Sequence, residues 1–531
     1  MGNANMPATR VLSADGGEGL AVSLRLALPN LLFGLLVVYN TVRLFRHAMW
    51  RDELQTFMVT RASNTLPDLY AKLGYEGHPG LWHLLVWVVT RFTGDPVAMQ
   101  ALHLLIALGI WVLIWRLSPF RPIEKLLLLA SYFLFWEYFI VSRNYALAVL
   151  LGFGFIALRA SRPEQRFWPW VLLGLLANTT VFGAIWALGL GFFFLLQDRR
   201  DWRSMLPGVA VFAALLAVAL DTMVPAPDFR FASPTPHFTF GFDKSLRFVV
   251  GGFIPLFPPF VSETLSWFGG WAAKLAARPF GHDPTQQIFL LLGGAESFSW
   301  LALGALLFPV LACLAIVRDW KLTAQYAVIY SGIILFPQLW SYLGAPRHYG
   351  FVFIVLVGTV WMWRSRMLPA RPVGWLWLVL LAINVIGGLT TLSASSYPYS
   401  QSRNAALWLT RHHLESAFLI GVRDVTTSPV AGYLGREIYY PQCQCFGSYI
   451  EFSTRRKMTL TAEEVVAGVG RAMQKEGKDK AILIMSLPYP LDQQTLDPKL
   501  VFRPIKRFPR AIVADEAYVI YAVRMKEEPG Q

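Results

Sequence analysis

Apolar runs long enough to cross a lipid bilayer recur along the first three quarters of the chain, and they constrain its fold more than any other feature. A helix needs about 20 such residues to cross a hydrocarbon core of about 30 Å. Lipid cannot satisfy exposed strand edges, and these continuous runs lack the alternation of barrel strands. Hydrophobic residues make up 55% of the chain, charged residues make up 15%, and the mean hydropathy is +0.45. The sequence therefore predicts an α-helical polytopic membrane protein.

We expect about 11 transmembrane helices. They are expected at residues 27–44, 98–115, 125–141, 144–159, 167–179, 181–197, 205–222, 296–317, 324–342, 349–363 and 373–393. The run at 81–93 is too short to cross and carries His83 and Arg91, so a helix lying in the membrane interface is expected there. The two short neighbouring runs at 167–179 and 181–197 are also compatible with one broken helix in place of two separate spans.

The basic residues gather in short clusters between these runs, although the net charge is +14. This distribution is typical of a topology signal, so no nucleic-acid partner is expected. With a cytoplasmic N-terminal tail at 1–25, every inner loop is basic. The inner loops contain Arg116, Arg121, Lys125, Arg159, Arg162, Arg166, Arg199, Arg200, Arg203, Arg318, Lys321, Arg364, Arg366 and Arg371. The loops 45–97 and 223–295 then lie on the outer, extracytoplasmic face.

Two parts of the chain lie outside the expected spans on that outer face. In the 223–295 loop, the segments 248–261 and 266–280 are expected to rest on the bilayer surface. After residue 394 the apolar runs shorten to strand length, at 418–422, 437–440, 481–485 and 517–523. Thr461 and Glu464 form a capping box that opens a helix running to about Met473. Residues 394–531 are therefore expected to form a C-terminal extracytoplasmic α/β domain.

The cysteines give no disulfide framework and no paired metal motif. Cys313 is expected in a span, and Cys443 and Cys445 would cross-link only with strain, so their oxidation state stays open. The polar, Gly-rich start of the chain predicts no cleavable signal peptide.

Acidic residues stand where the first apolar run meets the outer face, in "RHAMWRDELQTF" at 46–57. Carboxylates at this position are costly unless solvated or paired, so Asp52 and Glu53 are candidate functional residues. A plain structural pairing with Arg46 or Arg51 is equally compatible with the sequence.

Three further polar clusters fall on the same predicted face. They contain Glu76, His78 and His83 in the first loop, Glu137, Arg143, Asn144 and Tyr145 at a junction of two runs, and Arg347, His348 and Tyr349 at a late helix start. Guanidinium groups bind phosphate with paired hydrogen bonds. Together these residues predict a site for an anionic lipid headgroup beside a carboxylate base.

These motifs resemble those of the C-type (GT-C) membrane glycosyltransferase superfamily. The shared features are the Asp-Glu pair after the first span, His78-Pro79, the "SRNYAL" junction at 142–147 and the late Arg-x-Tyr at 347–349. The likeness covers residues 25–390 and is nearest to bacterial protein O-mannosyltransferases, the lipid A aminoarabinose transferase and lipopolysaccharide core transferases. Residues 26–393 would then be the catalytic domain.

The resemblance implies a role for each matched residue. A sugar would pass from a polyprenyl-phosphate donor to an acceptor hydroxyl with inversion, on the outer face of a bacterial inner membrane. Asp52 would be the general base, and Glu53 would set its environment. The donor phosphate would bind the four cationic or imidazole residues, His78, Arg143, Arg347 and His348. The substrate-binding residues would be Glu76, Glu137, Tyr145 and Tyr349. The chain has His78-Pro79-Gly80 where the family often has His-Pro-Pro.

Several alternatives remain open from the sequence. A transporter or flippase of lipid-linked sugars also needs cations near an anionic headgroup, but would place ionisable residues near mid-bilayer. A polymerase or ligase of lipid-linked saccharides is a third class. The acceptor is open between a glycolipid, another glycan and a protein. No cofactor and no metal site are expected, although carboxylates near His78 leave a divalent ion possible in principle.

Overall fold

The computed structural model describes residues 15–230, 242–256, 300–339, 344–366, 374–392, 397–487 and 499–526. Helices before residue 393 are α1 (Asp15–Arg46), α2 (Arg51–Arg61), α3 (Leu66–Leu73), α4 (Leu81–Thr90), α5 (Val97–Val112), α6 (Pro122–Leu129), α7 (Asn144–Ser161), α8 (Trp168–Ala177), α9 (Val181–Gln197), α10 (Trp202–Thr222), α11 (Phe242–Phe253), α15 (Trp300–Val317), α16 (Trp320–Leu339), α17 (Pro346–Ser365) and α18 (Trp375–Thr390). Short helical turns are η1 (Leu113–Leu117), η2 (Phe133–Glu137) and η3 (Arg199–Asp201).

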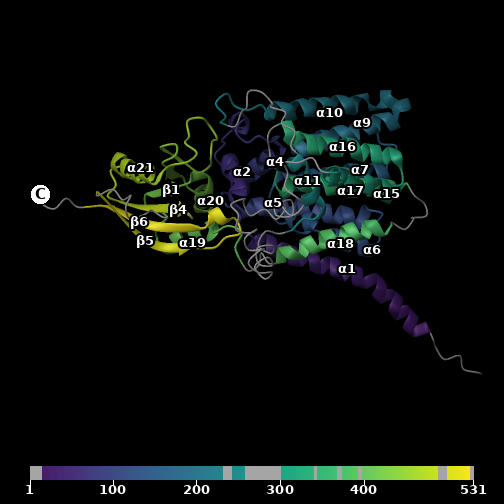
Figure 1. Cartoon of the computed structure of the whole chain (residues 1–531), viewed down its shortest axis with the longest axis horizontal. Helices are drawn as coiled ribbons and strands as arrows, with labels where there is room; N and C mark the ends of the chain where they lie inside the picture. Colours follow the sequence, from purple (N-terminus) through teal and green to yellow (C-terminus); the bar gives the residue numbers. More distant parts are fainter. Residues whose placement is uncertain are drawn as a thin grey trace, which may run out of the picture.

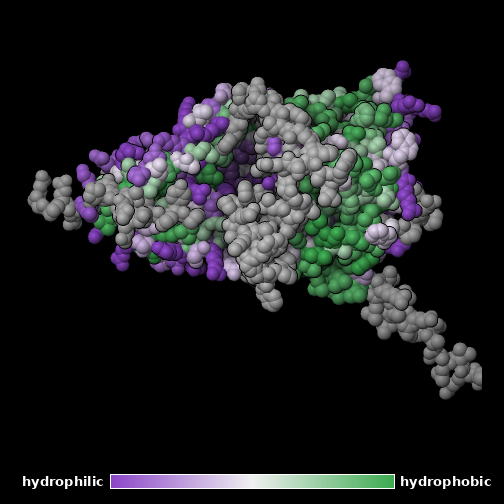
Figure 2. Space-filling model, viewed as in Figure 1, coloured by the Kyte–Doolittle hydropathy of each residue, from purple (hydrophilic) through white to green (hydrophobic). Residues whose placement is uncertain are grey.

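Most of these helices form one bundle with a C-terminal sheet domain at one end, and α2 and α4 lie between the two (Figure 1). Five described helical segments are long and apolar enough to cross a membrane, namely Ala27–Arg46, Val97–Leu117, Asn144–Ser161, Arg199–Thr222 and Trp320–Leu339. Figure 2 shows a hydrophobic surface around the bundle, with the hydrophilic sheet domain on one side and hydrophilic helix tips on the other. The expected helical membrane fold is thus confirmed, whereas the number of crossings stays a prediction.

Two predicted spans differ from simple helices. The run 125–141 breaks at 130–132 into α6 and the π-helical turn η2. The backbone of α18 packs closely here, because a Cβ on Gly388 would lie 2.1 Å from the Ala130 carbonyl oxygen. The runs 167–179 and 181–197 form two separate helices, since Thr180 accepts a hydrogen bond from Gly183 N at 2.8 Å and caps α9.

One expectation for the 223–295 loop is wrong. The beginning of the 248–261 segment was expected on the bilayer surface, but it belongs to α11, which packs inside the bundle against α17. Phe248 and Val249 are buried there. A Cβ on Gly251 would lie 2.3 Å from Tyr349, so paired glycines permit the close approach. The rest of the 248–261 segment after residue 256 and the whole 266–280 segment lie outside the described residues.

The basic loops meet at the end of the bundle opposite the sheet domain, which we call the far end. Arg159 lies 2.9 Å from Asp198, and Arg364 lies 2.7 Å from Glu124, so helices α6, α7, α9 and α17 meet there. The other end of α7 and of α17 carries Arg143 and Arg347. The basic residues of the predicted inner loops thus lie at one end of the bundle. The fold is therefore compatible with the topology in which all these loops are on the same side of the membrane.

The C-terminal domain contains the expected alternation of strands and helices. Its elements are α19 (Ser402–Arg411), β1 (Leu419–Val422), α20 (Asp424–Leu434), β2 (Ile438–Tyr440), β3 (Cys445–Gly447), α21 (Ala462–Lys475), β4 (Lys480–Ser486), β5 (Leu500–Phe508), η6 (Ala514–Glu516) and β6 (Tyr518–Met525). The strand order is β3-β2-β1-β4-β6-β5. Strand β1 pairs in parallel with β2 and β4, whereas the other pairings are antiparallel.

Helices cover both faces of this sheet. Ile420 and Val422 of β1 join the core with α21, whereas Leu419 joins the core with α19 and α20. The capping box is confirmed, because Thr461 and Glu464 exchange hydrogen bonds at the start of α21. The sequence left the cysteine pair open, and the structure joins Cys443 to Cys445 by a disulfide next to β3.

Candidate active site

The first turn of α2 carries Asp52 to the boundary between the bundle and the C-terminal domain. Arg347 Nη2 lies 2.8 Å from Asp52 Oδ2, and the Asp52 side chain is 26% exposed. Arg143 donates to the Asp52 backbone carbonyl. Both arginines stand at helix beginnings: Arg143 directly precedes α7, and Arg347 follows Pro346, which starts α17. The fold thus brings two arginines from distant parts of the sequence to Asp52.

These residues line a cavity of about 170 Å³ between the two domains. The bundle side is formed by Arg51, Asp52, Gln55, Glu76, His78, Arg143 and Arg347. The C-terminal domain supplies Val425, Ser428, Ile450 and Phe452. The sequence did not predict this second wall, because nothing in residues 425–452 carries a recognisable motif. The cavity therefore needs both domains to be complete.

The cavity is strongly polarised. Burial alone would raise the pKa of Asp52, but Arg347, Arg143 and Arg51 outweigh burial and hold that pKa below its ordinary value. Burial and then Arg143 lower the pKa of His78 to about 3, so its imidazole is neutral near pH 7. Arg143 Nη2 lies 3.5 Å from His78 Nε2. Around the ionised carboxylate of Asp52, the site thus presents the neutral imidazole of His78 and the guanidinium groups of Arg143 and Arg347, while the guanidinium of Arg51 pairs with the C-terminal domain.

Glu53 lies beside Asp52 in sequence but outside this cavity. Its carboxylate is fully buried and accepts from Ser142 N at 2.6 Å and from Trp50 N at 3.3 Å. His47 Nε2 lies 2.8 Å away. Glu53 therefore ties the end of α1, the start of α2 and the residue before Arg143 together, which is a positioning role.

Glu76 lines the cavity and also takes part in a series of polar contacts that runs from His83 to the C-terminal domain. Gln55 Nε2 donates to Glu76 Oε1 at 2.8 Å, and His83 Nε2 lies 3.6 Å from Glu76 Oε2. Gln55 also exchanges hydrogen bonds with the backbone of Ile450 in the C-terminal domain, at 2.7 and 3.0 Å. Gln55 was not predicted, because an isolated glutamine within a helix gives no sequence signal.

The remaining predicted residues surround the arginines. Tyr145 OH and His348 Nε2 lie 2.8 Å apart, and the guanidinium groups of Arg143 and Arg347 lie 5.9 and 6.0 Å from the Tyr145 ring centroid. Tyr145 and His348 do not line the cavity. The Tyr145 ring instead packs against the two guanidinium groups, and His348 contacts Tyr145. Tyr349 is buried against Phe248 of α11 and is not among the residues that line the cavity.

Glu137 lies deeper, at the end of η2. It is 9% exposed, and its Oε2 lies 3.5 Å from Tyr132 OH. The next residue, Tyr138, donates to the Arg347 carbonyl at 2.9 Å and so fixes the start of α17. Glu137 is not among the residues lining the cavity.

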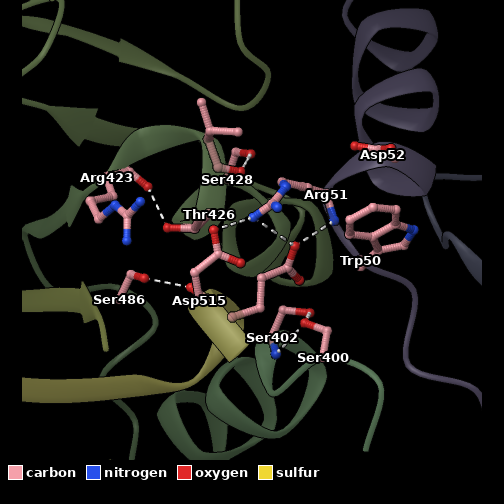
Figure 3. Close-up of polar contacts among 12 residues, drawn as sticks. Trp50, Arg51, Asp52, Ser400, Ser402, Arg423, Thr426, Ser428, Ser486 and Asp515 are labelled. Carbon is pink, nitrogen blue, oxygen red and sulfur yellow. Dashed lines mark hydrogen bonds and ion pairs between the residues drawn. The ribbon is translucent and has the colours of Figure 1, made fainter. Parts of the chain in front are cut away.

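A cluster of carboxylates on the C-terminal domain anchors α2. Arg51 Nη1 lies 2.9 Å from Asp515 and 3.7 Å from Glu516, and Arg51 N donates to Glu516 at 3.1 Å. Figure 3 shows Arg51 turned toward Asp515, with Asp52 apart from it on α2. Burial raises the pKa of Glu516 to about 8, although Arg51 opposes this shift.

A second, larger cavity of about 630 Å³ lies on the other side of the α1–α2 junction. Leu35, Val38 and Val42 of α1 give it an apolar wall, and Arg43 and Arg46 stand toward its polar end. Trp136, Tyr397, Pro398, Tyr399 and Ile512 complete it. An amphipathic molecule with a long tail and an anionic head fits this lining.

Within the described residues, no group of three or more His, Cys, Asp or Glu side chains is arranged to hold a metal ion.

Comparisons with known proteins give little beyond this geometry. No family model matches the sequence, and no curated protein matches it. The chain is similar to the crystal structure of ArnT from Cupriavidus metallidurans in the apo state, with 16% identity, a TM-score of 0.43, and coverage of 96% of this chain and 98% of that one. The structure of the same protein bound to undecaprenyl phosphate matches with 16% identity, a TM-score of 0.40 and the same coverage.

Proposed function

We propose that this protein is an integral membrane glycosyltransferase. It transfers a sugar from a polyprenyl-phosphate donor to an acceptor hydroxyl on the extracytoplasmic face of a bacterial inner membrane. The observation that supports this proposal most directly is the Asp52–Arg347 pair at 2.8 Å, with Arg143 beside it, in a cavity at the end of a hydrophobic bundle. A carboxylate and two guanidinium groups match the needs of a general base and of a phosphate leaving group.

The donor phosphate binds Arg143 and Arg347, assisted by the neutral imidazole of His78. Guanidinium groups form paired, charge-assisted hydrogen bonds with phosphate oxygens. A phosphate that shares Arg347 weakens the ion pair between Arg347 and Asp52, and the basicity of Asp52 then rises. Donor binding thus prepares the base for the next step.

Transfer proceeds by inversion at the anomeric carbon. The acceptor hydroxyl gives its proton to Asp52 while its oxygen forms the new bond to the anomeric carbon. The bond from that carbon to the phosphate oxygen breaks, and its electron pair leaves on the polyprenyl phosphate. Arg143 and Arg347 stabilise the charge that develops there, so the proposal requires no metal ion.

The surroundings of the site support a donor that carries a lipid. The apolar wall of the larger cavity along α1 offers a path for a polyprenyl chain, and Arg43 and Arg46 lie toward its polar end. The basic loops at the far end support a cytoplasmic position for that end, with the cavity and the C-terminal domain on the outer face. The acceptor is a glycolipid, a polysaccharide or a protein.

A transfer assay in membranes with a radiolabelled polyprenyl-phosphate sugar tests this proposal. We expect Asp52→Asn to lose at least a hundredfold in rate, which is the usual contribution of a general base. Asp68→Asn is the matched control, because Asp68 is a half-buried acid of the same loop region whose carboxylate contacts Lys72 and the Asn64 backbone and does not line the cavity. Equal transfer by Asp52→Asn and the wild type would refute the assignment of the base.

The orientation is tested separately with single cysteines. Arg46→Cys is expected to react with a membrane-impermeant maleimide from outside intact cells, and Arg200→Cys only after permeabilisation. Both positions are exposed, whereas Cys313 is buried. The reverse labelling pattern would exclude a site that opens to the extracytoplasmic side.

A further inference from the structure

A separate cavity of about 370 Å³ lies at the far end of the bundle. Its lining comes from α7, α9, α16 and α17 and from the loop after α7. Helices α7 and α17 begin beside Arg143 and Arg347, and their residues that line the far-end cavity lie 12 to 19 positions further along the chain, so this cavity is about 18–28 Å from the candidate active site. None of its lining residues belongs to that site.

The lining of the far-end cavity is amphipathic. Phe194 and Met362 contribute apolar surface, whereas Arg159 and Arg366 bring two guanidinium groups. Arg366 donates to Gln197 at 3.1 Å and is otherwise exposed. Such a combination fits a molecule with one anionic group and an attached hydrocarbon part.

The local charge favours an anion. Arg159 and Arg166 share Asp198, and Arg166 also reaches Asp201. With Arg366, this group of described residues carries one more positive than negative charge. The charge of Arg366 is not matched by a carboxylate in the described ion pairs.

A buried amide gives a second, independent indication of a ligand. Gln325 of α16 lines the far-end cavity and is 3% exposed. Its Oε1 has no hydrogen-bond partner among the described residues. Buried polar groups in proteins are nearly always hydrogen-bonded, and an amide oxygen only accepts, so a hydrogen-bond donor such as a headgroup hydroxyl is expected to enter the cavity.

We propose that the far-end cavity binds an anionic glycerophospholipid of the adjacent leaflet. Its phosphate lies at Arg366 and Arg159, its polar head reaches the Gln325 amide, and the beginning of an acyl chain contacts Phe194 and Met362. Basic pockets between membrane helices bind anionic headgroups in this way. The site is independent of the transferase proposal, and a lipid there holds four helices together.

The test uses the purified full-length protein in detergent, with thermal unfolding and native mass spectrometry as readouts. Phosphatidylglycerol is expected to raise the unfolding temperature and to stay bound, whereas phosphatidylcholine has a clearly smaller effect. Arg366→Gln removes a charged contact from an exposed position and is expected to weaken phosphatidylglycerol binding about tenfold. Gln325→Leu, which removes the amide without adding a charge, is expected to weaken it several-fold.

Arg200→Gln is the matched control, because Arg200 is an exposed cation at the same end that does not line the cavity. It should bind phosphatidylglycerol like the wild type. The proposal is overturned if both cavity variants bind as the wild type does, or if Arg200→Gln loses as much as Arg366→Gln. It is also overturned if soluble glycerol phosphate stabilises the protein as well as the lipid does, since the ligand would then be a free phosphate ester.

Discussion

Replacement of Glu53 by glutamine separates the positioning of the site from its chemistry. The Glu53 carboxylate is fully buried and has three polar neighbours, at 2.6, 2.8 and 3.3 Å. A glutamine whose oxygen still accepts from Ser142 N has lost the charge, and its amide nitrogen, which faces His47 and Trp50 N, accepts from neither. Breaking a buried charged contact of this kind costs about 3–5 kcal/mol.

The expected result is a fall of that size in the free energy of unfolding, measured by equilibrium unfolding in mixed micelles. Because Ser142 directly precedes Arg143, donor binding should also weaken. A double-mutant cycle with His47→Gln should give a coupling energy of at least about 1 kcal/mol, since the two side chains are in contact. Asp52→Asn is the comparison, because Asp52 is partly exposed and its loss should change activity more than stability.

Two results would refute this reasoning. A loss of less than about 1 kcal/mol in Glu53→Gln would show that the carboxylate does not hold the three segments together. Normal stability with abolished transfer would instead make Glu53 a chemical participant.

Three other predictions follow from single features. Glu124→Gln should destabilise the protein by about 3–5 kcal/mol, because Arg364 would stay buried without its partner, whereas Glu124→Leu with Arg364→Met should be nearly neutral in equilibrium unfolding. The pKa of His78 is about 3 when folded and about 6.5 when unfolded, so the unfolded state binds more protons as the pH falls; acidification from pH 7 to pH 5 should therefore cost about 1–2 kcal/mol more in the wild type than in His78→Gln. Replacing Cys443 and Cys445 by serine should cost only about 1.6 kcal/mol of unfolding free energy, because the disulfide closes a very short loop; a much larger loss in thermal unfolding would contradict this view.

The sequence predicted what depends on local pattern. Apolar runs such as 144–159 became helices because hydrophobic length decides the structure of a segment in lipid, and Thr461 with Glu464 marked a helix start. The acids, histidines and arginines were brought toward one end of the bundle, as their positions beside successive spans indicated. Their individual roles stay predictions.

Features that depend on distant partners could not be predicted. The stretch "LLLLASYFLF" at 126–135 contains no local signal that predicts the break between α6 and η2. The break lies against Gly388 of α18, which is distant in the sequence. The segment that became α11 resembles a surface helix until its packing against α17 is known. Strand β5 was missed because Pro504 and several basic residues obscure its pattern, as often happens at a sheet edge. The wall around Ile450 and Phe452 likewise depends on domain docking.

The attachment of α2 to the C-terminal domain has a consequence for protein engineering. Arg51 and Gln55 contact that domain from the same short helix that carries Asp52. A chimera that exchanges only residues after 397 would keep the original α2 beside a foreign outer domain. The contacts of Arg51 and Gln55 would then lack their partners. Swaps that carry Arg51–Arg61 along with the outer domain should assemble better, because this helix and that domain form one module although more than 300 residues separate them in the chain.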